Sequence, residues 1–493
     1  MPRRASAAEP SISRSKYDYE NHIIPSDDGG GTSYSPIRLF VQGDTLSKVI
    51  QYYKMHASGS QNCSHWDAEF VGRLHHETLF DLILASKYLQ FRGLLDLACQ
   101  TIASKIKGKS PHEICSIFNI NSFLTSELLD EEKIEKRLED PSRWSQMGMP
   151  IVPSEKPDFN QELELEEKAL RALDIVRCQE FTGYDPKVNG YMLNRFHSYN
   201  LAFFDLDKES DISRGPPLHT IPAPIRESIV EASVNVISLK VCESDVGFRV
   251  EVFGTVLARD QVDYRCVYLF RRERDDPQLI TLADDMLTLT DPCRGLVPED
   301  RIYFEINLKI KCDGGVIKDL SKGVIVFDRN RLPHDSPAMT LDLDSWLSIV
   351  ELTCAYVVYP VEATIDINIL KGSCSISRVA AWTTGNYEDR INLYHGGEAG
   401  GTRTVIRAGS CVPLIRCVVA VPLGKKLVLH LKDDAVDGFV GENLLVPIRQ
   451  SDQWITRKMG SCGELEVKVA WTVVPRRQRH GKLKVVGNEC LLL

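Results

Sequence analysis

The sequence predicts an α+β protein of several domains, in which a small, mainly helical head precedes an all-β antiparallel sandwich. Two patterns carry this prediction. Apolar residues recur at helical spacing between residues 77 and 118, whereas between residues 231 and 475 they alternate with polar neighbours, as in a strand. A third observation is the length of 493 residues, which is too long for a single hydrophobic core.

Composition and charge exclude several classes of protein. A hydrophobic fraction of 43% with 26% charged residues is typical of a soluble globular chain, and a formal net charge of -9 argues against a general nucleic-acid binder. No apolar run reaches the roughly 18 residues of a membrane span, and the basic, Ser-rich start lacks the apolar core of a secretory signal. It leaves an organelle transit peptide open. Fourteen cysteines without a CxxC pair predict reduced thiols in the cytoplasm and/or nucleus.

Five segments are expected along the chain. They are a largely disordered N-terminus (1–35), the helical head (36–140), a linker with one helix (141–230), the β-sandwich (231–475) and a basic C-terminal tail (476–493). In the linker, prolines interrupt regular structure before an amphipathic helix from Phe159 to about Val176, with Leu165, Ala169 and Leu173 on the same face as Val176.

The head begins with a short strand and a helix, and continues with three consecutive helices. Pro36–Val41 alternates as a strand, and a helix capped at Asp44 or Thr45 follows. Residues 77–89 are apolar around nearly the whole circumference, which predicts a helix buried on all sides, and Gly93 then breaks the pattern.

The next helix, to about Lys107, has two apolar faces. One is the stripe Leu94, Leu97, Ala98 and Thr101, and the other is Leu95, Cys99, Ile102 and Ile106. A small domain has only one core, so we expect the second face to be an exposed apolar surface that a partner covers. After it, Ser110 and Glu113 form a capping box around Pro111 and start a helix that directs Ile114, Ile117 and Phe118 to one side.

The words WDAEF, TLFDLILA, GLLDL, IKGK and PHEICSIFNI, in this order and at these distances, resemble the C-terminal half of the plant S-phase kinase-associated protein (Skp) family of SCF ubiquitin ligase adaptors. The resemblance covers roughly residues 36–122. It implies an N-terminally truncated BTB/POZ-type fold whose last helices grip an F-box protein while another face docks on a cullin. The implied F-box-binding residues are Leu95, Cys99, Ile102, Ile106, Phe118 and Ile120.

Two departures from the Skp pattern bear on the cullin. The second strand of the fold and the helix after it are absent, and Lys87 stands before Tyr88 where the family has an Asn. Lys87 and Tyr88 belong to the implied cullin-facing side, so we expect cullin binding to be weaker than F-box binding. A degenerate copy that keeps the helices and binds nothing is the alternative.

The β-rich region contains at least eight predicted strands and no helical pattern. Alternation is clearest at 248–252, 302–310, 361–369, 427–431 and 465–473, which suggests a β-sandwich of about 240 residues. Words such as FRVEVFGTVLARD and YFEINLKIK, within roughly residues 155–475, resemble a plant domain of unknown function that is abundant in grasses, alone or fused to other modules. This resemblance implies no chemistry, and we expect an unidentified protein ligand.

Enzyme motifs are absent from the sequence, with no GxSxG, HExxH or P-loop. We therefore predict no catalytic residue, no cofactor and no metal, and interpret the adjacent His75 and His76 as a solvated helix start. Four residues from the end, Cys490 opens a C-a-a-X motif whose Leu493 favours geranylgeranylation, after the basic residues Arg476, Arg477, Arg479, Lys482 and Lys484. Membrane association is expected only if Cys490 is prenylated; otherwise the segment is one more strand beside a basic loop.

The combined hypothesis is a non-enzymatic adaptor of an SCF-type E3 ubiquitin ligase that binds F-box proteins in ubiquitin-dependent degradation. Its partners would be F-box proteins, weakly a cullin, and a protein ligand of the sandwich, but not nucleic acid. The alternative is a protein-binding or stress-related β-sandwich that carries a vestigial Skp-like head.

Overall fold

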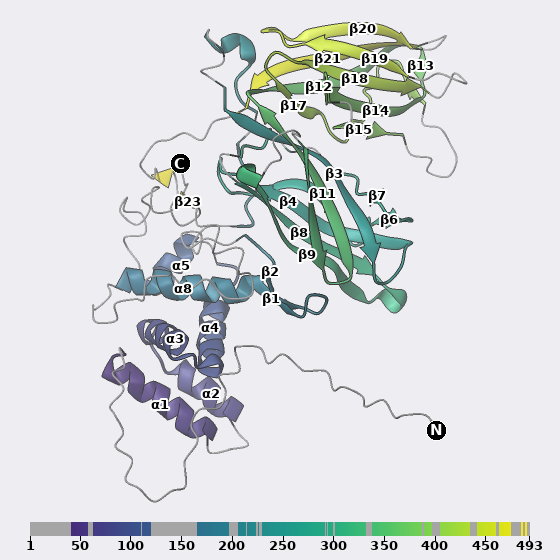
Figure 1. The fold of residues 1–493 in the computed structure, drawn as a ribbon. Helices are drawn as coiled ribbons and strands as arrows, with labels where there is room; N and C mark the ends of the chain where they lie inside the picture. Colours follow the sequence, from purple (N-terminus) through teal and green to yellow (C-terminus); the bar gives the residue numbers. More distant parts are fainter. Residues whose placement is uncertain are drawn as a thin grey trace, which may run out of the picture. The chain divides into compact units, whose positions relative to one another are not determined.

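A computed structural model describes the helical head, part of the linker and the β-rich region (Figure 1). The described residues are 41–57, 63–109, 111–119, 165–196, 206–474, 485–486 and 489–490, with short gaps inside 206–474 at 213, 223–224, 226–228, 291, 293, 299–300, 332–337, 387–388, 397–404, 434–440 and 460–462. Every helix and strand below belongs to one compact unit, Gln42–Leu493.

Six α-helices are described. They are α1 (Gly43–Ala57), α2 (Cys63–Gly72), α3 (His76–Leu89), α4 (Arg92–Ile106), α5 (Pro111–Phe118) and α8 (Leu165–Phe181). The helices predicted in the head all appear, and α2 is an addition that the apolar spacing did not indicate. The strand expected at Pro36–Val41 lies almost wholly outside the described residues, as do the expected N-terminal segment 1–35, the capping residue Ser110 and most of the basic tail. No helix in the described part of the chain is both long and apolar enough to cross a membrane.

Helix α3 is the centre of the head. It contacts α1, α4 and α8, and its apolar residues Leu79, Phe80, Leu82 and Ile83 are fully buried, as the sequence predicted. The break after α3 is at Gln90, which adopts a left-handed conformation with φ 58°, and not at Gly93, which lies inside α4. Gly93 serves another purpose, because a Cβ atom there would lie 3.0 Å from the hydroxyl of Tyr52.

The β-rich region is antiparallel between all its named strands, and it contains two packed pairs of sheets (Figure 1). The first pair comprises β3 (Ala232–Ser244), β4 (Val250–Arg259), β5 (Val267–Arg272), β6 (Gln278–Ile280), β7 (Asp285–Met286), β8 (Arg301–Lys311), β9 (Ile317–Asp328), β10 (Ala338–Ser345) and β11 (Ser348–Val358). One sheet has the order β10-β11-β3-β7 and the other has the order β5-β4-β8-β9, with β6 also pairing with β4.

The second pair follows directly along the chain. It comprises β12 (Pro360–Lys371), β13 (Ser373–Cys374), β14 (Ile376–Thr383), β15 (Ile391–His395), β16 (Ile406–Arg407), β17 (Val418–Pro422), β18 (Lys426–Asp433), β19 (Glu442–Pro447), β20 (Gln453–Met459) and β21 (Gly463–Val473). Its sheets have the orders β17-β12-β21-β20 and β15-β14-β18-β19, and β13 pairs with β16 beside them.

Each pair of sheets has its own hydrophobic core. The prediction of a helical head followed by antiparallel β-structure is therefore confirmed, and the five clearest alternating segments fall in β4, β8, β12, β18 and β21, with Phe248 just before β4. The sequence suggested one sandwich, whereas the region forms two. Alternation specifies which face of each strand is buried but not which strands share a core.

The linker does more than connect the head to the sheets. Helix α8 runs into a hairpin of β1 (Thr182–Asp185) and β2 (Gly190–Leu193), which the sequence did not indicate. At the end of α8, Phe181 joins an aromatic cluster with Phe196 of the linker, Tyr264 between β4 and β5, and Tyr303 of β8. The C-terminal end of α8 is thereby fixed to the β-rich region.

Candidate partner-binding surface of the head

The second apolar face of α4 is buried in this structure. Leu95 is 8% exposed, and Cys99, Ile102 and Ile106 are 2% exposed or less. The expectation that this face is open to solvent is therefore wrong for the described chain, while its role in binding an F-box protein stays a prediction. The residues form one face because they recur every three or four positions along α4.

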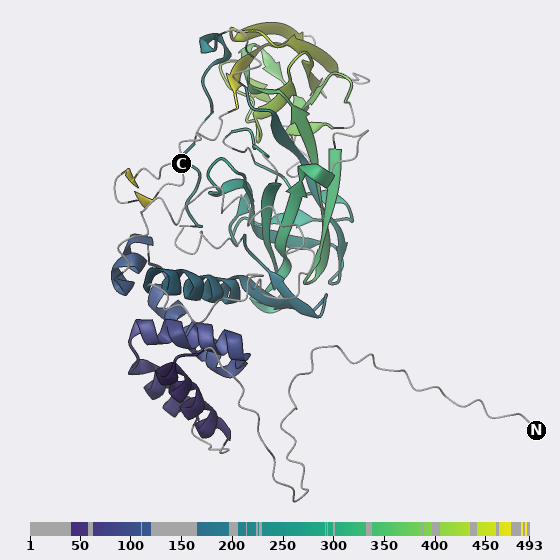
Figure 2. The same cartoon turned by 60° about the vertical axis from the view of Figure 1, so that its left-hand side comes forward.

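Helix α8 packs against α3 and α4 and supplies the cover (Figure 2). Its own apolar residues Ala169, Ala172, Leu173 and Val176 are at most 1% exposed. The two alanines let the helix axes approach closely, and the two branched residues fill the space beside them. The amphipathic face predicted from the sequence thus exists, and the described helix, Leu165–Phe181, continues past the predicted end at about Val176. The predicted start at Phe159 lies outside the described residues.

Two polar contacts fix the position of α8 along the head. The Lys168 ammonium lies 3.1 Å from a carboxylate oxygen of Asp81 on α3, and both side chains are mostly buried. Towards the other end, the Gln179 amide donates to the Asp96 carboxylate on α4 at 3.2 Å. These contacts lie on either side of the apolar stripe, so they specify both the direction and the register of the helix.

The thiol of Cys99 lies within this contact region. Burial, followed by the nearby Asp96 carboxylate, raises the pKa of Cys99 to about 12. A thiol with this pKa is almost wholly protonated at neutral pH and reacts slowly. Cys99 can therefore report whether the face is covered.

The residues implied to face a cullin have different surroundings. Tyr88 is exposed, whereas Lys87 is partly buried and burial lowers the pKa of its ammonium. Asp174 and Cys178 of α8 lie close enough to Lys87 to act on that pKa in the opposite direction. The Lys87 side chain is thus close to α8, and Tyr88 is the more exposed of the two.

Helix α5 contributes less to the covered face than the sequence suggested. Phe118 is fully buried and packs edge-on against Phe80 of α3, with ring centroids 5.1 Å apart. Ile117 on the same helix is exposed, and Ile120 lies outside the described residues. Phe118 therefore packs in the head core around α3, and its role in binding an F-box protein stays a prediction.

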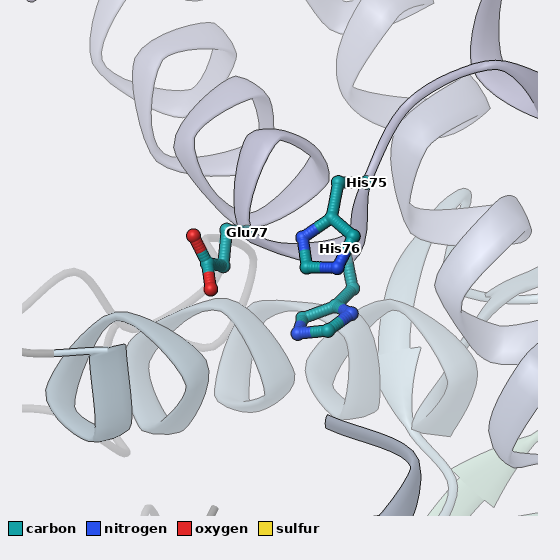
Figure 3. Close-up of side chains that lie close together, drawn as sticks. All are labelled: His75, His76 and Glu77. Atoms are coloured by element: carbon teal, nitrogen blue, oxygen red, sulfur yellow. The ribbon is translucent and has the colours of Figure 1, made fainter. Parts of the chain in front are cut away.

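His75, His76 and Glu77 lie at the start of α3 (Figure 3), and their potential ligand atoms all lie within 4.8 Å of one another. The His76 ring packs edge-on against Phe80 and Phe118, at 6.1 and 5.5 Å between centroids. Burial, followed by the charge of His75, lowers the pKa of His76. A neutral imidazole packed between α3 and α5 accounts for His76.

Cys490 lies in a pair of very short strands, β22 (Val485–Val486) and β23 (Glu489–Cys490), which form a sheet of their own. The C-terminal segment is thus strand-like, as the alternative to prenylation supposed, but it does not pair with either sandwich. Lipidation of Cys490 stays a prediction.

The sequence contained most of the signals for this surface and missed how they combine. It showed the second stripe of α4 and the stripe of α8, but not that the two pack on each other. Asp81, Asp96, Lys168 and Gln179 carried no signal, because an isolated charged residue on an amphipathic helix is ordinarily solvated.

Comparison with family models matches residues 92–140 to the Skp1 family, dimerisation domain, and residues 233–469 to a domain of unknown function (DUF6598). SKP1-like protein 18 of Arabidopsis thaliana is 45% identical over 106 residues, which cover 20% of this chain and 66% of the relative. SKP1-like protein 1 of Oryza sativa subsp. japonica is 40% identical, with 20% of this chain and 67% of the relative covered. The Skp1-related protein of Caenorhabditis elegans is 40% identical, with 22% and 69% covered.

The chain thus spans about two thirds of the length of these relatives, with 66% of the first. Among solved structures, human GIVD cytosolic phospholipase A2 aligns over 48% of this chain and 32% of that chain, at 8% identity and a TM-score of 0.16. A similarity this low carries no argument about fold or function.

Proposed function

This chain belongs to the Skp1 family, and from that premise we propose that it is a non-enzymatic adaptor of an SCF-type E3 ubiquitin ligase. It would bind F-box proteins for ubiquitin-dependent protein degradation in the cytoplasm and/or nucleus. The observation that supports this function is the second apolar face of α4, on a helix that packs against the amphipathic helix α8 in this structure. An apolar surface of this kind can bind a helical partner through the partner's i, i+3, i+4 and i+7 side chains.

A matched pair of variants in the full-length chain tests the F-box proposal. Cys99→Glu places a charge in the α4 face, and Ser104→Glu places the same residue on the exposed side of the same helix. We expect the first to abolish capture of a purified plant F-box domain and the second to preserve it, with equal far-UV circular dichroism. Loss of helicity together with capture would mean that Cys99 serves only the core, and capture by both variants would remove this face from the function.

The cullin is the partner for which support is weaker. The departure at Lys87 and its position near α8 favour weak or no binding, so the head would compete with complete Skp adaptors for F-box proteins. We expect no stable ternary complex when the purified chain, an F-box protein and a cullin are mixed and separated by size-exclusion chromatography. Robust co-elution of all three would contradict this expectation.

The competing function is a protein-binding β-sandwich with a vestigial head, and the burial of the α4 face by α8 is the observation that favours it. The ligand of the sheets would then be an unidentified protein. Under either function, prenylation of Cys490 would move the chain to membranes, and mass spectrometry of the C-terminal peptide from plant-expressed protein decides whether that lipid is present.

A further inference from the structure

Helix α8 belongs to the same polypeptide as the surface it covers. Its position therefore raises the question of whether it is a permanent part of the head core. The head core is already formed by the first stripe of α4, in which Leu94 and Ala98 are fully buried, and by α3. Helix α8 adds a second layer, which contacts both α3 and α4. A layer of this kind can be replaced by another helix without dismantling the core beneath it.

The contacts at the two sides of α8 are unequal. Beyond its C-terminal end the hairpin is held by Asp185, which is 1% exposed and whose two carboxylate oxygens each accept from the Trp346 backbone N–H at 3.0 Å. Lys187 adds ion pairs at 3.3 Å to Asp245 and Asp344. Towards the head, Lys168 and Gln179 make polar contacts around an apolar stripe, and the Tyr191 hydroxyl of the hairpin accepts from the exposed Arg92 at 3.1 Å. None of these groups is as deeply buried as Asp185. Separation would therefore occur between α8 and the head, with α8 remaining on the sheets.

We infer that α8 occupies the partner-binding face of the head in cis and must leave it before an F-box helix can bind. This inference rests on the proposed function for the identity of the partner. The same contacts define what fits the face: an amphipathic helix with small and branched residues in its stripe. A cation near the start of that helix would pair with Asp81, and a donor about three turns later would pair with Asp96.

The tether makes the occupant effective at any protein concentration. A segment joined to its site by a flexible connection acts at roughly millimolar effective concentration. A free partner must therefore bind the face tightly enough to displace a competitor at that concentration. If the face is open in only one to ten per cent of molecules, the apparent affinity for a partner falls by about ten- to a hundredfold. Opening the face should raise the apparent affinity for the partner by the same factor.

The test uses the full-length chain and two opening variants. Leu173→Glu places a charge in the α8 stripe, and Glu180→Lys, at an exposed position of α8, is the matched control. Lys168→Asp sets like charges against Asp81, and adding Asp81→Lys restores an attractive pair with the charges exchanged. The first readout is the rate of Cys99 alkylation by N-ethylmaleimide, mapped by mass spectrometry. The second is affinity for a purified plant F-box domain.

We expect Leu173→Glu and Lys168→Asp to raise the alkylation rate of Cys99 and the F-box affinity by about tenfold or more. The Glu180→Lys control and the charge-exchanged double variant should behave as the unmodified chain. A synthetic peptide of residues 163–182, added to Leu173→Glu, should protect Cys99 again. If Leu173→Glu prevents folding, the charge-exchange series gives the same answer with substitutions outside the apolar stripe.

The outcomes separate the inference from the proposed function. Unchanged Cys99 alkylation in both opening variants would overturn the inference, because α8 would then be permanent core. Faster alkylation with tight and unchanged F-box binding would also overturn it, since α8 would not compete, and the proposed function would stand. Faster alkylation that the peptide reverses, without F-box binding in any variant, would support cis occupancy of the face and overturn the proposed function.

Discussion

The helical head and the β-rich region bury their residues in contrasting ways. Within the described parts of α1–α5, the buried polar residues are Thr45 and Ser86, and the rest of the interior is apolar. The β-rich region encloses whole charged side chains. Arg259 and Arg294 are both fully buried, the first with its guanidinium against Glu305 and the second against Asp260.

This difference indicates which region is suited to exchanging partners. An apolar face accepts any helix of matching shape, so one occupant can replace another at modest cost. A buried charge tolerates only the group that pairs with it, because an unpaired charge in the interior costs several kcal/mol. The head therefore suits reversible binding. The sheets suit a fixed scaffold, on which the ion pairs hold the chain segments around Asp260 and Arg294 in one arrangement.

The largest loss of stability should come from breaking a buried ion pair in the β-rich region. Asp260 accepts from Arg294 at 2.5 and 2.8 Å and from the Val297 backbone N–H at 2.9 Å. Asp260→Asn leaves the Arg294 charge buried without its main partner, so we expect a loss of about 3–5 kcal/mol in the free energy of unfolding. Urea unfolding followed by tryptophan fluorescence measures it.

The control for this variant is an exposed acid in the linker segment that precedes the β-rich region. Asp207→Asn weakens an ion pair in which the Asp207 side chain is 85% exposed. Such a pair contributes at most about 1 kcal/mol. Similar small losses for Asp260→Asn and Asp207→Asn would remove the contrast between the two regions.

A smaller effect is expected where the linker meets the sheets. Asp185→Ala deprives the Trp346 and Lys187 backbone N–H groups of their acceptor, so we predict a loss of about 1–3 kcal/mol. Hydrogen exchange at the Trp346 amide should quicken in this variant. Asp245→Asn is the control, because its carboxylate is half exposed and Lys187 keeps Asp344. Equal protection of Trp346 in both variants would show that the hairpin does not fasten α8 to the sheets.

Sequence patterns predicted the buried face of each helix or strand better than the element that packs against it. The period of two in β8 and β12 and the double stripe of α4 follow from local geometry, which is the same wherever the element packs. Contacts between distant segments determine the division into two sheet pairs, the hairpin of residues 182–193 and the position of α8 on the head. No local period encodes those contacts.

The α4 face illustrates the limit of such patterns. Its spacing showed correctly that the face needs a partner, and Leu95, Cys99 and Ile102 are indeed buried together. A stripe carries no information on whether the partner is another chain or a later segment of the same one. The complementary stripe of α8 was visible in the sequence, but the ion pair of Lys168 and Asp81 joins residues too far apart for spacing to connect.

The smallest predicted effect is the change of stability with pH, which should have opposite signs in the head and in the β-rich region. The pKa of His76 is lowered by burial, so the folded head favours the neutral imidazole, and its stability is present above about pH 6.5 and lost as the pH falls through the lowered pKa. The pKa of Glu362, fully buried and accepting from the Gly295 backbone N–H at 2.6 Å, is raised by burial. The folded β-rich region there favours the protonated acid, so acidification through this raised pKa adds stability.

Hydrogen exchange measured by mass spectrometry at pH 7.5 and pH 5.5, corrected for the intrinsic rate, should show α3 and α5 losing protection and β12 gaining it. His76→Phe should remove the first change and Glu362→Gln the second, whereas parallel changes in both regions would mean that other groups control the response.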